Sequence, residues 1–252
     1  MAARADPSHK CMPNTQAARF LTARWAKLAM ASYEVDPAIL QPFVPARTEL
    51  DLWSGKCFVS VVGFQFLDTR VLGVPVPFHR DFEEVNLRFY VKRSNDPETR
   101  RGVVFVKEIV PRRALAWIAN AVYNERYVAL PMSHDDQTSE ASRTLRYSWR
   151  HLGRWSHLRV LLNGDPYLPD ETSEEAFISE HYWGYTAQPD GSTLEYQVEH
   201  PRWHVWRTLD QELVCDVAAL YGATFARFLR GTPSSCFVAD GSEIVVRRGT
   251  PL

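Results

Sequence analysis

One stretch of the sequence brings together side chains that could transfer protons and bind an anion. From Glu84 to Val91, polar and apolar residues alternate strictly, which is the period of a β-strand with two unlike faces. The polar face carries Glu84, Asn86, Arg88 and Tyr90. A glutamate can move protons, and an arginine can pair with a carboxylate through two parallel hydrogen bonds. Glu84 is therefore a candidate acid/base, and Arg88 and Asn86 are candidate ligand-binding residues.

The alternation is compatible with two environments for this polar face. It either lines a polar cavity enclosed by a curved sheet or faces water, where Glu84 and Arg88 would form a weak surface ion pair. Because charged side chains are mostly exposed, the pattern by itself favours water.

Two other groups of residues have the types, but not the arrangement, of known sites. His200 and His204 are separated by Pro201, which breaks any helix and so excludes the shared helical face of a zinc-binding HExxH pair. The run from Ser133 to Asp136 contains serine, histidine and aspartate, but consecutive residues cannot form a nucleophile–base relay without help from the fold. We interpret this run as a polar loop and predict neither a metal site nor a cofactor.

Lys107 is the one lysine set in an apolar strand, 103–108. Inside a cavity its amine could become nucleophilic. More often such a lysine extends from a strand edge to water or to a partner. The sequence leaves the direction of Lys107 open.

The composition is that of an ordinary soluble globular protein. The formal net charge is −1 and 45% of the 252 residues are hydrophobic, so a nucleic-acid partner is disfavoured. No apolar run approaches the roughly 20 residues of a membrane span, and residues 1–17 resemble a flexible tail rather than a signal peptide. The four cysteines show no CxxC spacing, which favours a reduced, cytoplasmic protein. A homo-oligomer is compatible with all of this.

The elements that must position these residues are mostly strands. We predict about ten strands and three helices, which together favour a mainly antiparallel β fold (α+β), a barrel or sandwich with helical additions. Asp36 and Pro37 predict the start of a short helix at 36–40, and the capping-box pattern at 172–175 predicts another helix that ends near His181. The remaining predicted helices are 112–126 and 216–229. The predicted strands are 20–35, 48–53, 56–67, 84–91, 102–110, 142–151, 154–162, 182–187, 192–199 and a final hairpin of 236–238 with 243–247 over Asp240-Gly241.

Several strings of the sequence resemble one family when they are taken together. They are FLTARW at 20–25, VDPAIL at 35–40, DTRVLGVP at 68–75, FEEVNLR at 82–88, EIVPRR at 108–113, YNE at 123–125 and VEHP at 198–201. No single string is specific, but the set covers nearly the whole chain after the tail. It resembles the YqjF-like family, domain of unknown function 2071.

That resemblance implies a fold and a pocket. The family is similar in fold to acetoacetate decarboxylase, which implies a single acetoacetate decarboxylase-like β domain over 18–252 around a closed polar pocket. In the decarboxylase a strand carries a pocket glutamate, which matches Glu84, and a Pro-Lys-Lys segment supplies the Schiff-base lysine. Here Met132 and Ser133 follow Pro131 where lysines would stand. Arg24 corresponds to an arginine of the first strand.

These observations lead to one main hypothesis and two rivals. The main hypothesis is a small-molecule site for an anionic or carbonyl-bearing compound, bound by Arg88 with Arg24 and oriented by Asn86 and Tyr127. Any enzyme activity would then be lyase-like or hydrolase-like, would use Glu84, and would not proceed through a Schiff base. The rivals are a non-catalytic ligand-binding or sensor protein and a structural or oligomer-forming domain.

Overall fold

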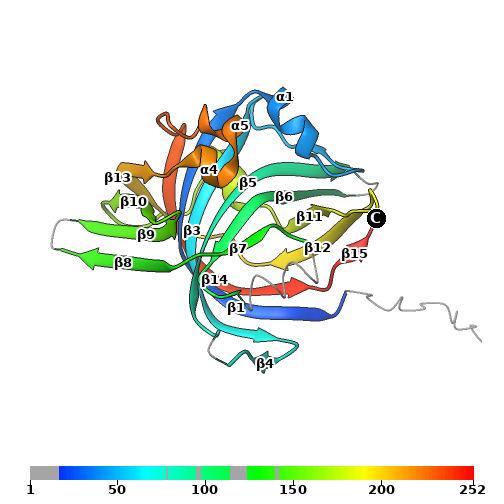
Figure 1. Ribbon diagram of the computed structural model, residues 1–252, viewed down its shortest axis with the longest axis horizontal. Helices are drawn as coiled ribbons and strands as arrows, with labels where there is room; N and C mark the ends of the chain where they lie inside the picture. Colours follow the sequence, from blue (N-terminus) through cyan, green and yellow to red (C-terminus); the bar gives the residue numbers. More distant parts are fainter. Residues whose placement is uncertain (1–16, 78, 95–97, 114–123, 140–141) are drawn as a thin grey trace, which may run out of the picture.

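The fold is a mostly antiparallel sheet with short helices around it (Figure 1). The computed structural model describes residues 17–77, 79–94, 98–113, 124–139 and 142–252. The strands of the first half are β1 (Arg19–Val35), β2 (Glu49–Leu50), β3 (Cys57–Val71), β4 (Val74–Pro75), β5 (Phe82–Ser94), β6 (Thr99–Val110) and β7 (Tyr127–Ala129). Those of the second half are β8 (Met132–Thr138), β9 (Arg143–His151), β10 (Arg154–Leu162), β11 (Trp183–Ala187), β12 (Thr193–Glu199), β13 (Val205–Val214), β14 (Ser235–Arg247) and β15 (Thr250–Pro251).

The helices described are short. They are α1 (Pro37–Leu40), the 3-10 helix η1 (Gln41–Phe43), α3 (Glu174–Ser179), α4 (Val217–Tyr221) and α5 (Ala223–Ala226). Among the described residues, none of the helices is long and apolar enough to cross a bilayer.

Seven strands close into a ring that encloses the site. They pair in the order β12, β11, β6, β5, β3, β1 and β14, and β14 pairs back to β12 through Val198–Val246 and Glu199–Val245. Helix α3 packs against the inner face of the ring, because its Phe177 and Ile178 belong to the same buried cluster as inward-facing residues of the strands. The predicted barrel-like or sandwich-like antiparallel fold is confirmed.

A second layer covers the outside of the ring. Strands β13, β10, β9 and β8 continue the sheet beyond β14 as a wing, visible on the left of Figure 1. Tyr147 and Trp149 of the wing share one buried cluster with Val61 and Leu87 of the ring. The contact is close at Gly63, where a Cβ would lie 2.6 Å from the Tyr147 ring. The apolar face of β5 is therefore buried between two layers.

The polar face of β5 points into the ring. Glu84, Asn86 and Arg88 are only 2%, 1% and 8% exposed, whereas the alternate residues of the strand, such as Leu87, belong to the outer core. The two faces of this strand thus meet two different interiors. The solvent-exposed alternative is wrong, because ring closure encloses the polar face of β5 from Glu84 to Tyr90.

Two one-residue bulges control which side chains point inward. On β6, Lys107 pairs with Leu87 and Phe105 pairs with Arg88, so Val106 is an extra residue. On β1, the pairing skips in the same way between Ala26 and Ala29, and Lys27 has a φ of 56°. A bulge reverses the inward and outward alternation of the residues that follow it.

Local sequence signals were reliable where a cap or a turn defined the element. The side chain of Asp36 accepts a hydrogen bond from the Ala38 N–H at the start of α1, and that of Ser173 accepts one from Ala176 at the start of α3. Strands β1, β5, β6, β9, β10, β11 and β12 lie where the alternation predicts them. Most of the helix predicted at 112–126 lies outside the described residues.

Four predictions about elements are wrong. The polar run 133–136 is part of strand β8, and the final hairpin is the continuous strand β14, because β1 pairs with it along its whole length from Ser235 to Arg247. Strand β13 had no prediction at all. The strand predicted at 48–53 shortens to β2 and pairs with β5. The helix predicted at 216–229 breaks into α4 and α5 at Gly222, whose φ is 97°.

Candidate functional site

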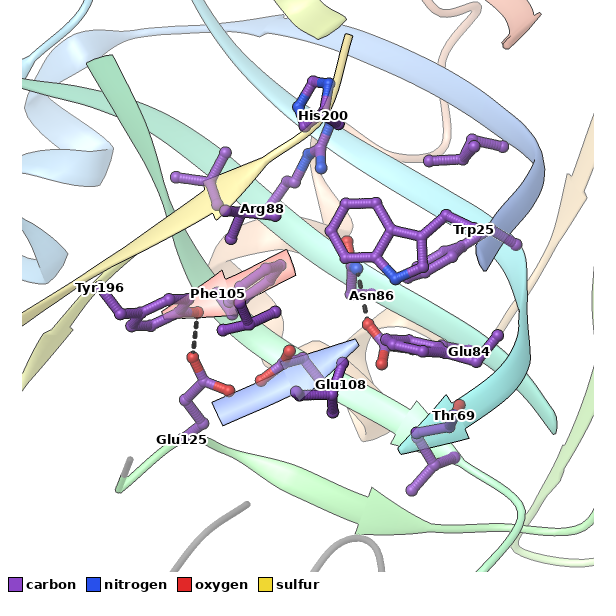
Figure 2. A pocket seen from close by; sticks show the side chains of 18 of the residues that line it. Trp25, Thr69, Glu84, Asn86, Arg88, Phe105, Glu108, Glu125, Tyr196 and His200 are labelled. Atoms are coloured by element: carbon purple, nitrogen blue, oxygen red, sulfur yellow. Dashed lines mark hydrogen bonds between the residues drawn. The ribbon is translucent and has the colours of Figure 1, made fainter. Parts of the chain in front are cut away.

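A cavity of about 150 Å³ lies inside the ring of strands. Most of its wall is apolar, with aromatic side chains that include Trp25, Phe64, Phe66 and Phe105. Figure 2 shows polar side chains projecting into it from several strands. A cavity of about this size in another protein holds a molecule as large as benzene, so the space suits a small organic ligand.

Glu84 lies at the centre of the polar wall. Its Oε1 accepts a hydrogen bond from Asn86 Nδ2 at 2.9 Å, and its Oε2 accepts one from the Tyr127 hydroxyl at 3.2 Å. Asn86 is two residues further along β5, so both side chains share the inward face, while Tyr127 comes from β7 beside β6. Three of the residues that the sequence analysis singled out are thus in direct contact.

Two more carboxyl groups lie beside Glu84. Glu108 follows the bulge of β6, and Glu125 precedes β7 and accepts a short hydrogen bond from the Tyr196 hydroxyl of β12 (Figure 2). Glu108 and Glu125 are hydrogen-bonded to each other, and Tyr127 is hydrogen-bonded to Glu108. The three carboxyls and two phenols form one connected cluster, in which Glu84, Glu108 and Tyr196 are buried and Glu125 and Tyr127 are half-buried.

The surroundings of Glu84, Glu108 and Glu125 favour the protonated form of these carboxyl groups. Burial raises the pKa of Glu84 to about 8 and that of Glu125 to about 7. Burial, together with the charges of Glu125 and Glu84, raises the pKa of Glu108 well above its ordinary value. A desolvated carboxylate is costly, and adjacent negative charges add to that cost. At neutral pH Glu84 is therefore a proton donor held in place by two hydrogen bonds.

Arg88 is the one lysine or arginine among the described lining residues. Its Nη2 donates to the carbonyl oxygen of Ile178 in α3 at 3.4 Å, and its guanidinium carbon lies 5.7 Å from the centre of the Tyr90 ring. Its Nε has no hydrogen-bond partner in the part of the chain that the structure describes. No acidic side chain of that part lies within ion-pair distance of Arg88. By contrast, Arg93, Arg101 and Arg247, which are half-buried, each pair with a carboxylate.

Two neutral histidines complete the polar wall. Burial lowers the pKa of both His181 and His200 to about 4. The His181 Nε2 lies 3.1 Å from Asp51 Oδ2, and the His200 ring stacks on Trp203 with the centroids 4.1 Å apart. Both rings are uncharged at neutral pH, which leaves Arg88 as the cation of the cavity.

Several polar atoms of the cavity wall lack partners within the described residues. Buried polar groups are nearly always hydrogen-bonded, so a cluster of exceptions calls for an explanation. Six such atoms belong to residues that line this cavity: Trp25 Nε1, Thr69 Oγ1, Asn86 Oδ1, Arg88 Nε, Glu108 Oε2 and His181 Nδ1. The set contains both donors and acceptors.

The structure does not bring Arg24 to the cavity. Leu21 and Trp25 of β1 line it, so Arg24 has the opposite parity and is exposed on the outer side of the strand. Lys107 also points outward, and its amine donates to the carbonyl oxygen of Leu220. Both residues are therefore excluded as direct ligand contacts.

The sequence analysis missed Glu108, Glu125 and His181 as lining residues. The sequence did contain a sign of Glu108, because this residue is the one acid of the apolar strand 103–108 and stands next to Lys107. It could not be used, because only the bulge at Val106 decides which of the two faces inward. Glu125 and His181 lie at element ends, where no periodicity indicates direction. Among the described residues no group of three or more metal-ligating side chains has a geometry that could hold a metal ion.

Comparison with known sequences finds a matching family model and a similar curated protein. The family model DUF2071, described as an uncharacterized conserved protein, matches residues 22–243. The uncharacterized protein YqjF of Bacillus subtilis (strain 168) is 31% identical over 117 residues, which are 46% of this chain and 45% of YqjF. The alignment thus spans less than half the length of that relative.

Comparison with solved structures identifies the fold. Acetoacetate decarboxylase from Legionella pneumophila subsp. pneumophila str. Philadelphia 1 superposes with a TM-score of 0.63 at 14% identity, covering 100% of this chain and 98% of the other. The enduracididine biosynthesis enzyme MppR complexed with pyruvate superposes with a TM-score of 0.62 at 12% identity, covering 99% and 98%. The chain has the acetoacetate decarboxylase-like fold, and identities this low carry no more than the fold.

Proposed function

The chain belongs to the DUF2071 family, and from its cavity we propose that it binds a small carboxylate or related carbonyl compound, to or from which Glu84 transfers a proton. In this proposal Arg88 binds the anionic group, and Asn86 and Tyr127 hold the Glu84 carboxyl. The ligand is limited in size by a cavity of about 150 Å³.

The observation that carries the proposal is that Arg88 faces the cavity without an ion-pair partner among the described residues. This cation is buried, and its neighbouring acids have raised pKa values. A buried, uncompensated charge is destabilising. A ligand carboxylate would supply the missing charge and accept the free Nε–H through a charge-assisted hydrogen bond.

The chemistry proposed is general acid–base catalysis. Glu84 is protonated at neutral pH and joined to Glu108 through Tyr127, so the cluster can deliver a proton and share the resulting negative charge. A carboxyl whose pKa lies near the working pH is suited to such a role. We do not propose a Schiff-base step, because no described lysine lines the cavity.

The ligand class has support from a protein of similar fold. One solved structure of MppR is that of its complex with pyruvate, a small carbonyl-bearing carboxylate. We transfer only this size and charge class to the present chain. The alternative, a non-catalytic binder or sensor, uses the same cavity, and the missing lysine favours it over a Schiff-base decarboxylase.

Calorimetric titration with small carboxylates tests the binding proposal. The parent protein should bind at least one member of a panel of two- to four-carbon carboxylates, and Arg88→Gln should weaken that affinity by about tenfold or more. Arg24→Gln is the matched control, since it removes an arginine from β1 outside the cavity, and it should leave the affinity unchanged. Equal loss in both variants, or no binding to the parent, would reject the proposal.

Glu84→Gln separates an enzyme from a binder. Gln resembles the protonated acid in shape but cannot release a proton, so a catalytic Glu84 predicts retained binding with turnover of the bound compound abolished. A product-forming reaction that survives this substitution would exclude Glu84 as the acid/base. A tightly bound compound that the parent never converts would favour the sensor function.

A further inference from the structure

A second polar group of the cavity wall has a defined hydrogen-bonding state. His181 follows α3 and lines the cavity, and its side chain is almost completely buried. Its ring packs against Tyr90 and Phe177, with centroid distances of 4.7 and 5.2 Å. These contacts fix the orientation of the imidazole.

Asp51 determines which ring nitrogen carries the proton. Burial alone would raise the pKa of Asp51, but hydrogen bonds from His181 and Arg101 lower it overall, with Arg101 Nε at 2.6 Å from Oδ2. An ionised carboxylate can only accept hydrogen bonds, so the Nε2 of the neutral His181 ring donates to it. Nδ1 is then a bare acceptor, and it has no partner within the described residues.

This acceptor is close to the anion-binding donor. The Tyr90 ring is a common neighbour of the two groups, 5.7 Å from the Arg88 guanidinium carbon and 4.7 Å from the His181 ring centre, and the charge of Arg88 contributes to the lowered pKa of His181 after the larger effect of burial. Arg88 also contacts the backbone of Ile178, three residues before His181. Arg88 and His181 both line the cavity, so a carboxylate bound to Arg88 can present a substituent on its neighbouring carbon to His181.

We propose that His181 accepts a hydrogen bond from a hydroxyl group on the carbon next to the carboxylate, so that the ligand is a 2-hydroxy carboxylate. A 2-oxo group has only lone pairs to offer and would be repelled by the Nδ1 lone pair, and an unsubstituted carbon would leave Nδ1 without a partner. Asp51 acts as a positioning residue, because it fixes the tautomer and does not contact the ligand. This inference rests on the proposed carboxylate site at Arg88.

The test compares ligands that differ only at that carbon. Lactate, propionate and pyruvate are titrated into the parent protein and into His181→Phe, Asp51→Asn and Arg88→Gln. The parent should bind lactate at least about fivefold more tightly than either of the other two. His181→Phe should reduce this preference to less than about twofold while the affinity for propionate stays the same. Asp51→Asn should reduce the preference in the same direction, and Arg88→Gln should weaken lactate and propionate equally.

The outcomes distinguish the two proposals. If the parent binds lactate and propionate equally and Arg88→Gln weakens both, the role of His181 is rejected and the carboxylate site stands. A preference for pyruvate also rejects the role of His181. If none of the three acids binds the parent, both proposals fall. The comparison within the parent protein needs no variant, so a folding defect in His181→Phe cannot hide the answer.

Discussion

Lys107 and Glu108 are consecutive residues of β6, and the bulge at Val106 turns Glu108 into the cavity and Lys107 out of it. Val103 and Phe105, before the bulge, face the cavity, so unbroken alternation would have continued with Lys107. The bulge at Lys27 acts likewise on β1, where Trp25 and Leu28 line the cavity and Lys27 pairs with Asp136 of β8. The two bulges thus keep the amines of Lys107 and Lys27 out of the cavity.

The first prediction is that carbonyl compounds will not be trapped on a cavity lysine. Treatment with pyruvate or acetoacetate and borohydride should leave no reduced adduct on a lysine in the cavity, because the amines of the four described lysines bind other groups. Lys27, Lys56 and Lys92 pair with acids, and Lys107 bonds a backbone oxygen. Intact mass spectrometry with peptide mapping is the measurement.

Lys10 lies outside the described residues and is the fifth lysine of the chain. Lys10→Arg therefore serves as the control for any adduct found on Lys10. A reduced adduct on Lys27 or Lys107 would contradict the outward direction of these side chains and would restore a Schiff-base reaction as an option.

The second prediction concerns stability at alkaline pH. The pKa of Glu84 is raised to about 8 in the folded state, whereas an unfolded glutamate titrates near its ordinary value, so the folded state binds the proton more tightly. The stability from this group is fully present below pH 4.5 and is lost as the pH rises through about 8. The free energy of unfolding of Glu84→Gln, relative to that of the parent, should therefore be higher at pH 9 than at pH 5 by about 4 kcal/mol.

Denaturant titrations from pH 5 to pH 9 measure how the free energy of unfolding of the parent and of Glu84→Gln changes with pH. Glu83→Gln removes a carboxyl that contacts His134 rather than the cavity, and it controls for the loss of one acid. Parallel pH profiles for the parent and Glu84→Gln would mean that Glu84 is not a protonated buried acid.

The alternation of β5 predicted the residues of the site better than it predicted their surroundings. Parity grouped Glu84, Asn86 and Arg88 correctly, since a strand fixes side-chain direction locally. Whether that face met water depended on ring closure between β12 and β14, 100 residues away and more, which no local pattern contains. The bulges at Lys27 and Val106 could not be predicted for the same reason, since they are set by pairing with neighbouring strands. Arg24 was wrongly predicted to reach the ligand because the alternation of β1 does not reveal which of its two faces points inward. Only the positions of Leu21 and Trp25 in the structure identify that face.

The third prediction tests a close backbone approach at the cavity wall. A Cβ on Gly184 of β11 would overlap the Tyr196 ring, whose hydroxyl donates to Glu125. Gly184→Ala should push this ring aside, destabilise the protein by about 1–3 kcal/mol and weaken ligand binding. Gly231→Ala is the control, because its Cβ would make only an ordinary contact at 3.5 Å with the Phe228 oxygen. Equal melting temperatures for the two variants would show that β11 tolerates a side chain here.

The fourth prediction concerns the size limit of the ligand. A second cavity of about 80 Å³ shares two lining residues, Phe105 and Glu125, with the first, so these side chains separate the two spaces. Phe105→Ala should join them and shift binding from two- to four-carbon carboxylates toward chains two or three carbons longer. The removed aromatic contacts should cost about 2–3 kcal/mol of stability, because Phe105 is half-buried.

Phe82→Ala provides the matched enlargement on another wall. Phe82 lines the first cavity and stacks on Phe66, with centroids 4.7 Å apart, but does not line the second. Calorimetric titration of both variants with a series of carboxylates of increasing length should show the longer preference in Phe105→Ala alone. The same shift in both variants would mean that any enlargement relaxes the size limit, and no shift in either would place the ligand away from Phe105.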